Sequence, residues 1–165
     1  EQMTGVPQID KVKKFIDLAL EAGIKICLNF VYTFKNQQEL NNVILYAVGK
    51  GIDVKVIELI KDGSNSSLHA DIGKLRGELL ADSSRSERVS KSEEIFYFGD
   101  SKTTVRIIYS YCNNRDAEAC NDHGELRITP SLELKPCLKD ENTQVSIRED
   151  VHSGNIEAIK AKIEL

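Results

Sequence analysis

Residues 23–60 read GIKICLNFVYTFKNQQELNNVILYAVGKGIDVKVIELI, and this stretch decides the fold. It contains two strand-like runs, each directly after a glycine: Ile24–Thr33, which is nearly continuously apolar, and Ile52–Ile60, which reads as the next buried strand. Such runs are typical of parallel strands buried on both faces. Between them, apolar residues at every third or fourth position predict a helix that opens with a capping box at 36–39 and ends at Gly51. Two successive helix–Gly-Ile–strand units predict an α/β fold with parallel crossovers.

Further elements are expected on both sides of this stretch. Helices are predicted over 7–22, from an apolar stripe that includes Phe15 and Ile16, and over 68–80. Residues 82–92 are polar and are expected to form a surface connection. Two antiparallel hairpins are predicted over 95–111 and 126–134. Two short helices near 145–151 and 155–163 would end the chain.

The cysteines suggest a metal centre. Cys112, Cys120 and Cys137 fall within one segment, where the second hairpin would bring Cys120 and Cys137 to one end and Cys112 would arrive from the preceding strand. Three converging thiolates suit an iron–sulfur cluster or a zinc ion. A Cys112–Cys120 disulfide and ordinary packing are the alternatives. Cys27, within a strand, is expected to pack in the core.

Composition limits the classes of function. The 165 residues are 41% hydrophobic, which suits a globular protein, and the net charge of −4 argues against a general nucleic-acid binder. No apolar run reaches the roughly 20 residues of a membrane span, and the chain opens without a signal-peptide pattern. The expectation is a cytoplasmic protein without a membrane partner.

The expected sheet is incomplete. The chain begins on a helix, and two parallel strands leave edges that invite further pairing. The sequence therefore predicts part of a larger barrel: either a fragment, or a chain that completes its sheet with a partner, such as a second copy in a homodimer.

Segments in one order along the chain carry a family resemblance. They are Thr4-Gly5, Ala22-Gly23, L-N-F-V at 28–31, V-K-V-I-E-L-I at 54–60, Cys112, C-N at 120–121, L-R-I-T at 126–129, K-P-C-L at 135–138 and V-S-I-R at 145–148. In these segments the chain resembles the C-terminal half of the family of molybdenum cofactor biosynthesis protein A, the radical S-adenosylmethionine (SAM) GTP cyclases, which are lyases.

The resemblance implies a fold and a site. It implies that 1–92 is part of an incomplete radical-SAM α/β barrel and that 93–165 is a C-terminal extension. There, Cys112, Cys120 and Cys137 would hold an auxiliary [4Fe–4S] cluster whose open iron meets GTP. SAM would bind through the N-terminal half, because this sequence contains no C-x-x-x-C-x-x-C, so that alone it is not expected to generate a radical.

Individual residues follow from the same resemblance. Asn29 and Lys55 are expected in the cofactor-binding barrel interior, with Glu58 as a structural partner of Lys55, and Arg127 is expected to contact the substrate. Cys27 and Glu125 stand where the family has cations. A carboxylate in place of a guanidinium reverses the charge, so another auxiliary-cluster enzyme with a different substrate is an alternative. A non-catalytic interaction domain stabilised by a metal or a disulfide is the third.

Overall fold

The computed structural model describes residues 8–114, 126–137 and 142–164. The chain divides into two compact units, Glu1–Arg115 and Asp116–Leu165. This division falls later than the functional boundary expected at 92/93, because the hairpin that follows residue 92 belongs to the sheet of the first unit. The assignment of 93–165 to a cluster-carrying extension stays a prediction.

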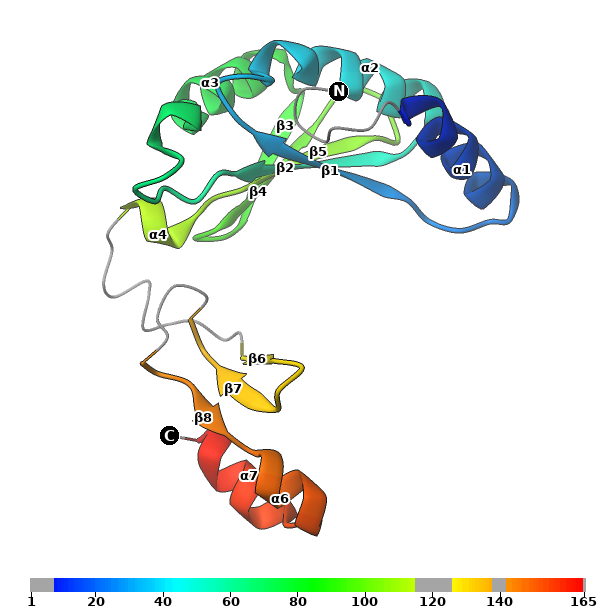
Figure 1. The fold of residues 1–165 in the computed structure, drawn as a ribbon. Coiled ribbons are helices and arrows are strands. Elements are labelled where there is room, and N and C mark those ends of the chain that lie inside the picture. The colour runs from blue at the N-terminus through cyan, green and yellow to red at the C-terminus, as the bar shows by residue number, and fades with distance from the viewer. Residues whose placement is uncertain (1–7, 115–125, 138–141, 165) are drawn as a thin grey trace. The chain divides into compact units, whose positions relative to one another are not determined.

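The first unit is an α/β structure built on a mixed five-stranded sheet (Figure 1). Its spatial order is β1-β2-β5-β4-β3. β1 and β2 pair in parallel, as predicted, and β5 adds a third parallel strand beside β2, while β4 and β3 are antiparallel. The strands are β1 (Cys27–Tyr32), β2 (Asp53–Glu58), β3 (Arg85–Ser90), β4 (Glu93–Tyr97) and β5 (Thr104–Ile108).

Three helices, α1 (Ile9–Glu21), α2 (Leu40–Lys50) and α3 (Ile72–Asp82), lie on one face of this sheet (Figure 1). Short 3-10 helices, η1 (Gln37–Glu39) and η2 (Ser66–Leu68), and the short helix α4 (Tyr111–Asn114) complete the unit. The core lies between helices and sheet, where Phe96, Val54, Val105 and Ile107 are fully buried. Among described residues 8–114, no helix covers the opposite face, which is called the open face below.

Local chemistry explains the helix ends. Gly23 and Gly51 have φ of +75° and +67°, the left-handed region in which glycine carries no Cβ penalty, and they end α1 and α2 as predicted. Asp71 begins α3 by accepting hydrogen bonds from the backbone N–H groups of Gly73 (2.9 Å) and Lys74 (3.1 Å).

The capping box expected at 36–39 is wrong. The Asn36 side chain turns back and accepts from the Thr33 amide at 2.9 Å, so it closes the end of β1 instead of opening α2.

The expectation that β1 and β2 are buried on both faces is also wrong. β2 alternates between buried and half-buried residues, and β1 is more exposed still. All three long helices cover the same face, so the other face of these strands keeps contact with solvent. The apolar sequences of β1 and β2 therefore do not mean that both faces of these strands are buried.

The apolar stripe of α1 divides in the same way. Ile16 is buried against the sheet, whereas Phe15 is 69% exposed. The region expected as a polar connection contains β3, a mostly exposed strand that pairs with β4 at the margin of the described sheet.

The second unit has a small antiparallel sheet of order β6-β7-β8, with β6 (Arg127–Ile128), β7 (Glu133–Lys135) and β8 (Val145–Ser146). The hairpin predicted over 126–134 is therefore confirmed. The helices α6 (Arg148–Ser153) and α7 (Ile156–Ile163) follow. Within the described part of the chain, no helix is long and apolar enough to cross a membrane.

Candidate functional site

The open face brings two predicted site residues together. Asn29 of β1 and Lys55 of β2 are direct register partners, and Lys55 in turn stands opposite Arg106 of β5. Residues directly opposite in neighbouring strands share one face of a sheet, so the row Asn29–Lys55–Arg106 crosses three parallel strands on the open face. The predicted pairing of Lys55 with Glu58 is wrong, because an odd spacing along β2 sends Glu58 to the helix-covered face.

The two cations in this row differ in their contacts: Arg106 has a carboxylate partner, and Lys55 has none among the described residues. Arg106 donates to the Glu93 carboxylate at 3.2 Å, and Asp53 Oδ1 accepts from both the amide and the hydroxyl of Thr104 at 2.8 Å. Lys55 forms no ion pair with any described residue of the chain. The face therefore offers a half-buried ammonium beside a guanidinium that has one carboxylate partner.

The thiol of Cys27 lies close to both Lys55 and Arg106, and both affect its pKa. Partial burial of the thiol raises its pKa, Lys55 lowers it, Asp53 raises it and Arg106 lowers it, and the net effect is a raised pKa. Lys55 and Arg106, on two neighbouring strands, therefore both lie near enough to this thiol to lower its pKa. Cys27 is exposed here and is not a core residue, which corrects the packing expected for it.

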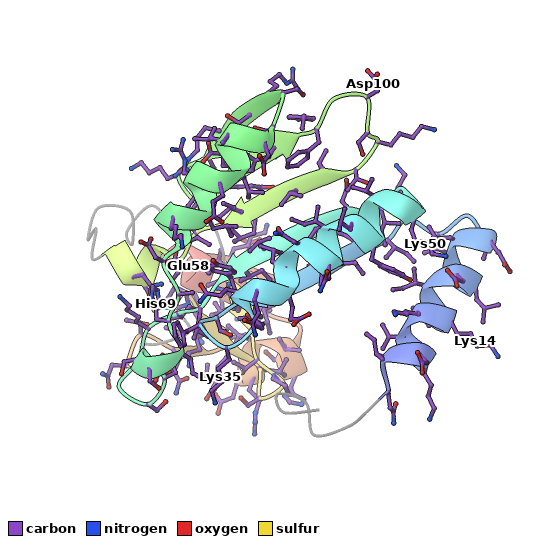
Figure 2. All side chains as sticks on the ribbon, turned by 90° about the horizontal axis from the view of Figure 1, so that it is seen from above. Lys14, Lys35, Lys50, Glu58, His69 and Asp100 are labelled. Atoms are coloured by element: carbon purple, nitrogen blue, oxygen red, sulfur yellow. The ribbon has the colours of Figure 1, made fainter. Side chains whose placement is uncertain are left out.

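A second polar group lies at the carboxyl ends of the parallel strands. Glu58 is 6% exposed and accepts a hydrogen bond from the Ser110 amide at 2.7 Å, while His69 Nε2 lies 3.5 Å from its other oxygen. Figure 2 shows Glu58 and His69 together at this end of the sheet. The hydroxyl of Ser110 is buried and has no hydrogen-bond partner among the described residues. This end of an α/β sheet is where such folds place their ligand sites.

Asn113 ties the start of α4 to the end of β2. Its Nδ2 donates to the Leu59 carbonyl at 2.8 Å, and its Oδ1 accepts from the Lys61 amide at 2.7 Å. The same Nδ2 lies 3.3 Å from His69 Nε2. The neighbouring residue, Cys112, is a half-buried free thiol. The hydrogen bonds of Asn113 thus fix the segment that presents Cys112.

The predicted cysteine site is only partly described. Cys112 belongs to the first unit, Cys137 is half-buried in the second unit, and Cys120 lies outside the described residues, as do Glu125 and His123. Among the described residues, no group of three His, Cys, Asp or Glu side chains could hold a metal ion. Since one of the three predicted ligands is outside that set, convergence of the three sulfur atoms stays a prediction.

Arg127 lies on β6 and is half-buried. Its register partner on β7 is Lys135, so this hairpin also places two cations opposite each other. Its predicted contact with a substrate stays a prediction.

Several residues of these groups were not predicted from the sequence, among them Arg106, His69 and Asn113. Arg106 carried a usable signal, because T-V-R-I-I places a cation inside an apolar strand just as V-K-V-I does for Lys55. His69 and Asn113 carried none, since both lie outside strands and meet Glu58 and Leu59 only through the tertiary fold.

Together, these features define an α/β protein with a mixed sheet, a polar row on its open face and a polar cluster at the carboxyl ends of its parallel strands. The sequence is similar, over its whole length, to the C-terminal half of curated GTP 3′,8-cyclases.

One such relative, from Sulfurisphaera tokodaii and named "Probable GTP 3′,8-cyclase", is 30% identical over 100% of this chain and 52% of its own length. A relative of the same name from Methanocella arvoryzae is 30% identical over 94% of this chain and 50% of its own length. The GTP 3′,8-cyclase of Haemophilus influenzae is 27% identical over 96% of this chain and 48% of its own length. The chain thus spans about half the length of the curated relatives it matches. No family model and no solved structure matches it significantly.

Proposed function

We propose that this chain is the C-terminal portion of a radical SAM enzyme of the GTP-cyclase type, acting in molybdenum cofactor biosynthesis. The observation that carries the proposal is the end-to-end similarity to one half of several curated GTP 3′,8-cyclases, in archaea and bacteria alike. Similarity over the whole chain, and not over one motif, favours a shared fold as well as shared residues.

The sheet suits such a portion of a larger barrel. β1 is the first strand in the sheet order and pairs only with β2 in the described part of the chain. Its backbone N–H and C=O groups on the other side are available to a further strand, as in a barrel that closes its edges. In the proposal, the N-terminal half supplies that strand, in cis or in trans, together with the SAM site.

The substrate site would lie on the open face. On that face, Asn29 and Lys55 would bind polar and anionic parts of the bound molecules. Arg127 is proposed, separately, to contact the substrate through its guanidinium. Cys112, Cys120 and Cys137 would hold an auxiliary [4Fe–4S] cluster, which, when bound, offers an iron to a donor atom of the nucleotide. Cys112 fits this role in that it is a free thiol on a segment held by Asn113. Cys120 lies outside the described residues.

One observation favours a second candidate function. Cys27, where the resemblance expects a cation, faces the open side of the sheet beside Lys55. Loss of a cation there would weaken binding of a triphosphate, which favours an auxiliary-cluster enzyme with a less anionic substrate.

Anaerobic reconstitution of the full chain with iron and sulfide tests the proposal. We expect about four irons per chain, and loss of iron in Cys112→Ser, Cys120→Ser or Cys137→Ser but not in Cys27→Ser. Absence of a cluster in the unmodified chain, under conditions in which the chain is folded, would leave the non-catalytic interaction domain as the better account. GTP titration of the reconstituted protein then separates the first candidate from the second, which predicts no saturable GTP binding.

A further inference from the structure

We propose that Arg106 is an anion-binding residue that works as a pair with Lys55 on the open face, and that the pair binds the phosphate chain of the substrate while Glu93 holds Arg106 in place. This inference rests on the proposed function for the identity of the substrate, a nucleoside triphosphate. It adds two residues, Arg106 and Glu93, that the family resemblance does not supply.

The first support is the register. Lys55 and Arg106 are direct partners on the neighbouring strands β2 and β5. Like charges directly opposite each other in a sheet destabilise it. A fold that keeps two cations in this position gains stability from an anion between them, so the arrangement is best explained by a ligand of opposite charge.

The second support is the partnering of the nearby acidic groups. Asp53 already accepts two hydrogen bonds from Thr104, and Glu93 is bound to Arg106. Neither carboxylate neutralises Lys55, which forms no ion pair with any described residue. The half-buried ammonium of Lys55 is therefore available to a bound anion.

The third support is the shape of the guanidinium. The Arg106 side chain is 36% exposed and uses its Nη1 on Glu93. A guanidinium has five donors in a planar fork, so one carboxylate contact leaves others for a phosphate oxygen. The contact with Glu93 orients the fork and also competes with the ligand for its charge.

Because Glu93 competes with the ligand for Arg106, substitutions of these two residues should change the affinity for an oligophosphate in opposite directions. Arg106→Gln should weaken binding of an oligophosphate about tenfold, because charge-assisted hydrogen bonds are lost. Glu93→Gln should strengthen it by a factor of about 2–5, because a competing anion next to the ligand is removed. A gain of affinity cannot result from a misfolded variant, so Glu93→Gln keeps the test meaningful if Arg106→Gln fails to fold.

The experiment is calorimetric titration of the full 165-residue chain, without iron, with inorganic tripolyphosphate at low ionic strength. Lys74→Gln is the matched control, since Lys74 is an exposed residue of α3 whose replacement removes the same charge from the helix side. Arg106→Lys should give an intermediate affinity, because it keeps the charge but loses the fork. Lys74→Gln should bind like the unmodified chain.

The proposal is overturned if the unmodified chain shows no saturable binding, if Arg106→Gln binds as tightly as the unmodified chain, or if Lys74→Gln loses as much affinity as Arg106→Gln. The probe needs no cluster, so this outcome is independent of reconstitution. A chain that binds tripolyphosphate through Arg106 but fails to bind iron would retain the inference and refute the proposed enzyme. A chain that binds iron and GTP, and whose GTP binding is unchanged by Arg106→Gln, would support the proposed enzyme and refute the inference about Arg106.

Discussion

The backbone amide of Ser110 donates a 2.7 Å hydrogen bond to the buried carboxylate of Glu58, which joins the end of β5 to the end of β2. Asn113 adds two more bonds, to Leu59 and Lys61, within the next turn of chain. The segment that carries Cys112 is thus held at several points, and its position depends on side chains that a strand-by-strand reading of the sequence does not connect.

Asn113→Ala should release this segment. Two hydrogen bonds are lost, each worth about 0.5–1.5 kcal/mol, so local opening around Cys112 should become on the order of tenfold more frequent. The measurement is the rate of thiol labelling in a background that retains only Cys112. The exposed Asn41→Ala is the control and should leave the rate unchanged; equal rates in all three chains would contradict the described hydrogen bonds.

Glu94 should be the main acid-sensitive residue of the first unit. It is 2% exposed, and it accepts from Arg76 at 2.7 Å, Tyr109 at 2.8 Å and Arg88 at 3.0 Å. Burial alone would raise the pKa of Glu94, but these hydrogen bonds outweigh it and the pKa is lowered. Because the pKa of Glu94 is lower in the folded protein, its ionised carboxylate stabilises the fold at pH values above the ordinary glutamate pKa of about 4.3. This stabilisation is lost as the pH falls through the pKa that Glu94 has in the folded protein.

We therefore expect Glu94→Gln to lower the free energy of unfolding by about 1–3 kcal/mol at pH 7, and by less at pH 3.5. Urea denaturation at the two pH values measures both quantities. Glu78→Gln, which removes an exposed carboxylate 3.9 Å from Lys74, should cost less than about 1 kcal/mol. A loss for Glu94→Gln that is the same at both pH values would show that charge is not its cause.

Tyr109 should titrate late. Burial and the hydrogen bond to Glu94 raise its pKa from 10.0 to about 12. Because the pKa is raised, this contribution to stability is complete below pH 10 and is lost as the pH rises toward 12. The difference in tyrosinate absorbance between the unmodified chain and Tyr109→Phe isolates this residue from the other four tyrosines. A difference that appears with a midpoint near pH 10 would contradict the buried hydrogen bond.

Lys55→Met should stabilise the protein while it harms binding. The substitution keeps an unbranched apolar stem and removes the repulsion of Arg106, so the free energy of unfolding should rise by about 0.2–1 kcal/mol. Tripolyphosphate affinity should fall in the same variant. A loss of stability would mean that Lys55 is satisfied within the chain, and would remove one support for the anion site.

The sequence predicted those features that local chemistry determines. The two helix–Gly-Ile–strand units, the left-handed glycines Gly23 and Gly51 and both hairpins appear as expected, because periodicity and turn residues act over a few positions. β3 was missed because an edge strand with six mostly exposed residues needs no apolar alternation. The exposure of Phe15 was missed because only tertiary packing decides which half of a wide apolar stripe of α1 is used.

The candidate site residues were also predictable only in part. The placement of Asn29 and Lys55 on one face follows from strand alternation once β1 and β2 are in parallel register. The role of Glu58 could not be predicted, because its partners Ser110 and His69 reach it from the end of β5 and from beyond η2.

The two margins of the five-stranded sheet differ in kind. β3 closes one of them with arginine, serine and glutamate, which discourage the addition of another chain. Among the described residues, β1 pairs with no strand at the other margin, and Lys25 and Lys35 flank this strand in the sequence. If the isolated chain self-associates through β1, two copies would pair at the margin that β3 does not occupy, and we expect a dimer and not a filament.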